Sequence, residues 1–149
     1  MRAVIQRVKS ASVTVENDVI SSIDKGFLIL LGVVKGDTQV DIDYIASKIV
    51  GLRVFEDLDE KMNLSIKDIG GEIIVVSQFT LAGDARKGRR PSFSSAMPPE
   101  DANKMYMQVV EQIQSYGINT GTGSFGATMD VALINDGPVT ILLDSHRNF

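Results

Sequence analysis

The sequence predicts a single domain of mixed α/β structure, with mostly antiparallel strands and two main helices on one side of the sheet. Short apolar segments with a period of two residues dominate both ends of the chain. Two segments with a helical period interrupt them, and no linker or internal repeat divides the 149 residues. A chain of this length can bury one substantial core, so we expect one domain over residues 1–149.

The N-terminal part is expected to form strands. Residues 2–8 and 11–15 alternate apolar and polar side chains, which is typical of strands with one buried face. Turn signals bound a short strand at 19–23, and the continuous apolar run at 27–34 predicts a strand buried on both faces. The simplest assembly of these segments is an antiparallel meander.

Two helices are expected in the middle of the chain. The first begins after Thr38, where Asp41 completes a capping pair, and ends near residues 51–53. The second begins at Pro98 or Pro99 and ends at Gly117. Its buried stripe is expected to consist of Ala102, Met105, Val109, Ile113 and Tyr116.

The remaining strands are expected at 72–81, at 128–135 and at 139–144. The break between the last two reads "NDGPVT", in which Asp-Gly is a strong hairpin signal and proline cannot donate to a ladder. Two interpretations stay open for this break. It is a plain hairpin turn, or it uses an unusual peptide bond to present backbone atoms to a ligand.

Composition excludes several kinds of chemistry. A formal net charge of −4 provides no general basic field for nucleic acid, and the absence of cysteine removes thiolates, disulfides and Cys-ligated zinc. The single histidine, His146, lies near the C-terminus and is a poor candidate for a triad or a metal site. We expect no metal, no cofactor and no membrane span, and a cytoplasmic location, because the sequence contains neither a long apolar run nor a secretory signal.

Three segments carry side chains suited to binding. Hydroxyls and an amide end the strand at 72–81 and can bind an ester carbonyl or ribose, or else they satisfy local backbone. A basic run suits phosphate contacts with Phe93 stacking on a base, or else it is a solvated loop. Phe125 among glycines can stack on a flat ligand, or else it is a core side chain in a connector. The strand-end residues are Ser77, Gln78 and Thr80, and the basic run contains Arg86, Lys87, Arg89 and Arg90.

Five segments in this order resemble the D-aminoacyl-tRNA deacylase family of bacteria and eukaryotes. They are "MRAVIQRV", "SQFTL", "RKGRRPSF", "GSFGATM" and "NDGPVT", and the resemblance extends over the whole chain. It implies a hydrolase that cleaves the ester between a D-amino acid and the terminal adenosine of tRNA, which is chirality proofreading in translation. The expected fold is a three-layer β-β-α arrangement.

The resemblance also implies a homodimer with its active sites at the interface. In the family, a cis Gly-Pro peptide, here Gly137 and Pro138, enters the partner's pocket as a chiral gate, and Arg7 braces it. A rigid pair of carbonyl oxygens can meet the substrate amino group while main chain excludes an L side chain. Glycine has no side chain, so we expect activity on glycyl-tRNA as well.

The same resemblance assigns the pocket. Ser77, Gln78, Phe79 and Thr80 would line it, and the backbone amides of Phe79 and Thr80 are candidate oxyanion donors. Phe125 would stack on the terminal adenine with Met129 nearby, and the four basic residues would contact tRNA phosphates. The interpretation of water activation that we prefer is assistance by the ribose 2′-hydroxyl, because Thr80 as nucleophile lacks a visible base. The competing functions are a general small-ester hydrolase that uses Thr80 and a non-catalytic module that binds RNA ends.

Overall fold

The computed structural model describes all 149 residues, Met1–Phe149. Six strands form the main sheet: β1 (Arg2–Val15), β2 (Asp18–Ile23), β3 (Gly26–Gly32), β6 (Glu72–Ser77), β7 (Thr120–Thr122) and β8 (Asp130–Asp144). A separate two-stranded hairpin consists of β4 (Phe55–Glu56) and β5 (Met62–Leu64). The helices are α1 (Gln39–Gly51), the short 3₁₀ helix η1 (Phe79–Ala82) and α2 (Pro99–Ser115).

Strand β1 lies at the centre of the sheet, so the expected N-terminal meander is wrong. Strands β2 and β3 lie end to end along one edge of β1, and β8 follows its other edge. Ile23 pairs with Ala11 and Gly26 pairs with Val8, so the register continues unbroken past the turn signal at Lys25. The segment at 24–25 bends the chain instead of reversing it. Most pairings are antiparallel, and only β3–β6 and β6–β7 are parallel.

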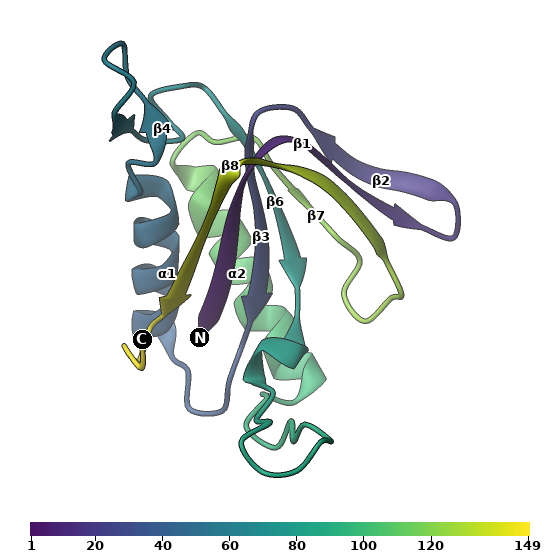
Figure 1. Cartoon of the computed structure of the whole chain (residues 1–149). Coiled ribbons are helices and arrows are strands. Elements are labelled where there is room, and N and C mark those ends of the chain that lie inside the picture. Colours follow the sequence, from purple (N-terminus) through teal and green to yellow (C-terminus); the bar gives the residue numbers. More distant parts are fainter.

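The sheet has a core on each face, which produces three layers. Alternation along β6 sends Ile73 and Val75 to the larger core under α1 and α2, and Ile74 and Val76 to the smaller one. The smaller core is closed by β2, which contacts β6 and β7 as the sheet curls back over itself. Both helices cover the same side of the sheet, as the sequence predicts (Figure 1).

The helices begin where the sequence places them. The backbone N–H of Thr38 donates to the Asp41 carboxylate at 2.7 Å, which caps α1. In α2 the buried stripe differs from the expected one, because Tyr106 is buried and Tyr116 is exposed. The Tyr106 hydroxyl donates to the carbonyl of Val75 at 2.6 Å and thereby joins α2 to β6. No helix is long and apolar enough to cross a bilayer.

The segment "NDGPVT" does not form a hairpin. Both halves of β8 pair with the same strand, because Asn135 lies opposite Val8 and Thr140 lies opposite Gln6. The chain therefore keeps its direction, and residues 136–139 leave the ladder as a bulge. The Asp-Gly signal could not distinguish the two outcomes, because a bulge and a tight turn both favour a glycine with positive φ. Gly137 has φ +120°.

Candidate functional site

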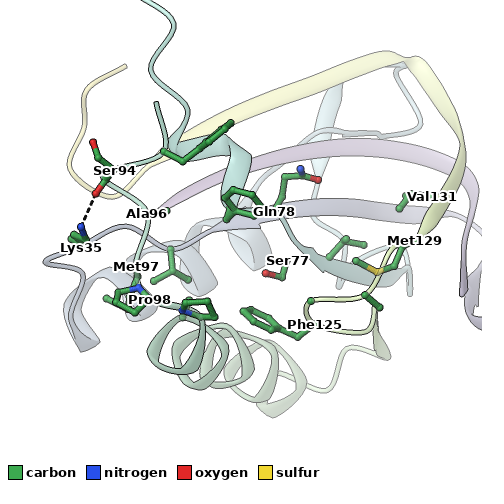
Figure 2. A pocket seen from close by; sticks show the side chains of 18 residues that line it. Lys35, Ser77, Gln78, Ser94, Ala96, Met97, Pro98, Phe125, Met129 and Val131 are labelled. Atoms are coloured by element: carbon green, nitrogen blue, oxygen red, sulfur yellow. Dashed lines mark hydrogen bonds between the residues drawn. The ribbon is translucent and has the colours of Figure 1, made fainter. Parts of the chain in front are cut away.

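A cavity of about 710 Å³ lies at the edge of the sheet where the parallel strands β3 and β6 end (Figure 2). Its walls come from these strand ends, from the loop before α2, from the first turn of α2 and from the segment at 125–131. This volume is in the range of small-molecule sites. The walls are mostly apolar and contain no carboxylate, imidazole or thiol. The polar side chains in the walls are those of Lys35, Ser77, Gln78 and Ser94.

The polar part of the pocket lies where β6 ends. Ser77 and Gln78 line the cavity, and Phe79 begins the turn of η1. The backbone N–H groups of Phe79 and Thr80 donate no hydrogen bond within the chain, because they are the first two of this helical turn. The Gln78 side-chain amide donates to the Thr80 hydroxyl. Thr80 itself is exposed and does not line the cavity, unlike the expectation from the resemblance.

The apolar wall contains the aromatic side chain that the sequence singles out. Phe125 is half-buried, and its ring centroid lies 6.1 Å from that of Tyr106, so the ring is held from behind by the core. The Met129 sulfur accepts the backbone N–H of Ser124 at 3.4 Å and packs against Gly123. Phe125 packs against the core and also lines the cavity, and its stacking on a flat ligand stays a prediction.

The Gly137–Pro138 peptide bond is cis, as the resemblance implies. The bulge that contains it is exposed to solvent, and a buried side chain of the same chain holds it from the interior. The buried Arg7 donates through Nε to the carbonyl of Asp136 at 3.2 Å and through Nη1 to that of Val54 at 2.6 Å. Arg7 therefore contacts the residue before the glycine and not the Gly-Pro carbonyls themselves.

The bulge lies far from the cavity of its own chain. Val131 lines the cavity and Gly137 follows it by six residues along β8, which corresponds to about 20 Å in an extended strand. Neither Gly137 nor Pro138 is among the 18 residues that line the cavity. Within a single chain these two parts of the expected site are not brought together.

The chain matches the family model for D-Tyr-tRNA(Tyr) deacylase over residues 4–144. The chain belongs to this family. A D-aminoacyl-tRNA deacylase from Desulfitobacterium hafniense (strain DSM 10664 / DCB-2) is 56% identical over 149 residues, and one from Clostridioides difficile (strain 630) is 58% identical over 149 residues. In both comparisons the match covers 100% of each chain.

Solved structures agree with the deacylase family fold. The c-Myc DNA Unwinding Element Binding Protein has a TM-score of 0.91 and 44% identity, covering 97% of this chain and 98% of that one. A probable eukaryotic D-amino acid tRNA deacylase has a TM-score of 0.81 at 14% identity, covering 95% and 97%. The second likeness concerns the fold alone.

The four basic residues of the family motif are not equivalent. Arg86 is held by Asp84 through two hydrogen bonds, at 2.9 and 2.6 Å, and this pairing holds the pKa of the Asp84 carboxyl well below its usual range. The charge of Arg86 is therefore largely compensated within the chain. Lys87, Arg89 and Arg90 are exposed and make no ion pair, so their charges remain available to an anion.

Two residues of the region were missed by sequence reasoning. Asn135 donates through its side-chain amide to the carbonyls of Arg7 and Val139, at 2.9 and 3.0 Å, and so spans the base of the bulge. Lys35 lines the cavity, three residues after β3 ends. Strand β3 runs parallel to β6, so whatever follows it meets the same edge as Ser77. The position of Lys35 beside Ser77 could be predicted only by first predicting that β3 and β6 are parallel.

Histidine makes no contribution to the cavity. His146 lies against Asp37 at 2.9 Å, and Asp37 also accepts from the amino group of Met1 at 2.6 Å. His146, Asp37 and Asp41 place three potential metal-ligating atoms within 4.8 Å of one another. The ammonium group of Met1, which pairs with Asp37, would repel a cation bound at these three residues.

Proposed function

We propose that this protein hydrolyses the ester bond of D-aminoacyl-tRNA, releasing the free D-amino acid and tRNA, and so proofreads chirality in the cytoplasm. One observation carries the proposal. Two adjacent backbone N–H groups, of Phe79 and Thr80, lack an acceptor beside a cavity whose walls contain no carboxylate, imidazole or thiol. Such a site suits a reaction in which oxygen gains negative charge and the substrate provides the proton chemistry.

The chemical step follows from these donors. Water attacks the ester carbonyl, the carbonyl oxygen gains charge, and the amides of Phe79 and Thr80 donate to it as it becomes an oxyanion. The bond to the ribose 3′-oxygen then breaks, and the proton released by water reaches that oxygen. We assign the relay of this proton to the neighbouring 2′-hydroxyl, because the walls of the cavity contain no carboxylate, imidazole or thiol. The Thr80 hydroxyl accepts a hydrogen bond from Gln78 and has no base beside it.

Handedness is decided by main chain. The gate of Gly137 and Pro138 would exclude the side chain of an L-residue by overlap, and it would admit glycine, so glycyl-tRNA is also a substrate. Because the gate lies about 20 Å along β8 from its own cavity, a second copy must provide it. The active unit is therefore a homodimer with each pocket completed by its partner. The brace from Arg7 supports the bulge from behind.

The tRNA end occupies the rest of the site. The terminal adenine stacks on Phe125, with Met129 beside it, and the ring is rigid because the core supports it. Lys87, Arg89 and Arg90 contact phosphates of the acceptor stem, whereas Arg86 contributes less because Asp84 already holds it.

One assay tests the proposal and its two alternatives. Purified protein is incubated with D-tyrosyl-tRNA, L-tyrosyl-tRNA and D-tyrosine ethyl ester, and release of tyrosine is measured. Rapid release from D-tyrosyl-tRNA alone is expected. Comparable release from the ethyl ester would favour a general esterase. Binding of tRNA without any release would favour a nucleic-acid-binding module, the property named for the c-Myc DNA Unwinding Element Binding Protein.

A further inference from the structure

Lys35 is the single charged side chain among the 18 residues that line the cavity. Figure 2 shows it at one end of the pocket, next to Ser94, with Met129 and Val131 at the opposite end and Ser77 between them. Lys35 is exposed, so its charge lies at the solvent-facing rim of the cavity, where it can meet a negatively charged part of a ligand.

The backbone around Lys35 is fixed by the loop that precedes α2. Val34 and Ala96 form an isolated antiparallel bridge, and the backbone N–H of Lys35 donates to the carbonyl of Ser95 at 2.9 Å. The side-chain ammonium donates to the carbonyl of Ser94 at 2.7 Å. These contacts hold an otherwise flexible side chain at the rim of the cavity.

The charge of Lys35 is not compensated within the chain. No carboxylate oxygen lies within 4.0 Å of its ammonium, whereas Arg86 pairs with Asp84 and Lys104 pairs with Glu100. An ammonium has three N–H donors, and the Ser94 carbonyl takes one of them. Two donors and a full charge remain for a ligand. Lysine is a common phosphate binder, acting as a compact point charge.

We propose that Lys35 binds the phosphodiester that joins the terminal adenosine of the substrate to the preceding nucleotide. The inference rests on the proposed function, because it requires the terminal adenosine to occupy the cavity. In the proposed site, adenine lies on Phe125 and the ester lies beside the Phe79 amide. The phosphodiester is the part of the terminal nucleotide that carries a charge. Lys35 is the remaining charged group of the cavity. It is a positioning residue and takes no part in bond breaking.

The test uses two short substrates that differ by one cytidine and the phosphodiester that joins it to the terminal adenosine. D-tyrosyl-adenosine has none, and D-tyrosyl-CpA has a single one, next to the terminal adenosine. Lys35→Met is compared with wild type and with Lys61→Met, which replaces an exposed lysine in the β4–β5 hairpin, none of whose residues lines the cavity. Lys35→Met is expected to lower kcat/KM about tenfold on D-tyrosyl-CpA, through KM, and to leave D-tyrosyl-adenosine unchanged. Lys61→Met is expected to change neither.

Salt dependence provides a second readout that a structural role would not move. Loss of one phosphate contact reduces the slope of log kcat/KM against log salt concentration on tRNA by about one. Lys35→Arg, which keeps the charge, is expected to recover most of the activity on D-tyrosyl-CpA.

Two results would overturn the inference. Equal losses on both short substrates would mean that Lys35 only shapes the loop. Selective loss on D-aspartyl-adenosine, with D-tyrosyl-CpA unaffected, would mean that Lys35 faces the amino-acid side chain. If the wild-type protein hydrolyses neither short substrate nor D-tyrosyl-tRNA, the proposed function itself fails, and that outcome is separate from the other two.

Discussion

The guanidinium of Arg7 holds the carbonyl of Asp136, 129 residues away in the chain, at 3.2 Å. Its other arm holds the carbonyl of Val54 at 2.6 Å. One buried side chain thus joins the central strand, the segment after α1 and the bulge of β8. The position of the exposed Gly137 is therefore set by a contact in the interior.

Replacing Arg7 with lysine should loosen the bulge without removing the charge. A single ammonium cannot reproduce the fork that reaches two carbonyls, so we expect a loss of about 1–3 kcal/mol in the free energy of unfolding. The ratio of activities on D- and L-tyrosyl-tRNA should also fall. Urea unfolding and the tRNA assay measure the two effects. Arg53→Lys is the matched control, because Arg53 donates to the carbonyl of Asn63 on the exposed surface.

Gly137→Ala should be destabilising because of backbone conformation and close contact. The glycine has φ +120°, and an added Cβ would lie 2.9 Å from Val139 Cγ2 and 3.0 Å from Arg7 Nη2. We expect a cost of about 1–3 kcal/mol in unfolding free energy, with loss of activity on D-tyrosyl-tRNA. Gly51→Ala, at the end of α1 with open space around it, should instead stabilise by about 0.5 kcal/mol. Similar values for both variants would contradict this account.

Mixed dimers should recover activity that neither variant has alone. Ser77→Trp fills the cavity and leaves the gate intact, whereas Gly137→Ala alters the gate and leaves the cavity intact. If the gate acts in the partner's pocket, co-refolding the two inactive proteins restores about a quarter of wild-type activity. About half of the dimers that form are mixed, and in each mixed dimer one of the two sites is complete. No recovery would show that each chain completes its own site.

Thr80→Ala should retain most of the turnover. Its backbone N–H, the proposed oxyanion donor, is unchanged, and the lost hydroxyl has no base beside it. We expect less than about a tenfold fall in kcat, because a side-chain hydroxyl without a base contributes little. A tRNA that ends in 2′-deoxyadenosine should be nearly inert with wild-type protein. Single-turnover kinetics on both decide the matter: an inactive alanine variant with a normal deoxy substrate would make Thr80 the nucleophile.

Tyr106 should contribute a decline in stability at alkaline pH. Burial raises the pKa of its hydroxyl to about 12, above the ordinary value of 10.0. Its contribution is complete below pH 10 and is lost as pH rises towards 12, because the unfolded chain ionises first. Tyr106→Phe should flatten this decline and cost about 1 kcal/mol at neutral pH, through the lost bond to Val75. Urea titrations between pH 8 and about 12 would show it, with Tyr116→Phe, an exposed tyrosine, as the control.

How much could be predicted depends on the range of the interaction. The helix start at Thr38 and the end of α2 near Gly117 are set by neighbours within one turn, and both were predicted from the sequence. The sequence did not predict which tyrosine of this region is buried, because Tyr106 and Tyr116 both fit the helical period of the apolar stripe. Only contact with Val75 and Phe125 selects Tyr106.

By itself, the sequence determined the alternation of strands and the limits of the helices, since these follow from local periodicity and capping. The strand expected at 72–81 ends at Ser77 instead, and the turn of η1 follows it. Only the tertiary structure decided that "NDGPVT" is a bulge and not a hairpin, because the direction of the chain after Pro138 depends on pairing with β1. It also decided that Lys35 meets Ser77 at one edge, which depends on the parallel pairing of β3 and β6. Pairing between strands distant in the chain is chosen by burial over the whole sheet, and no local pattern records that choice.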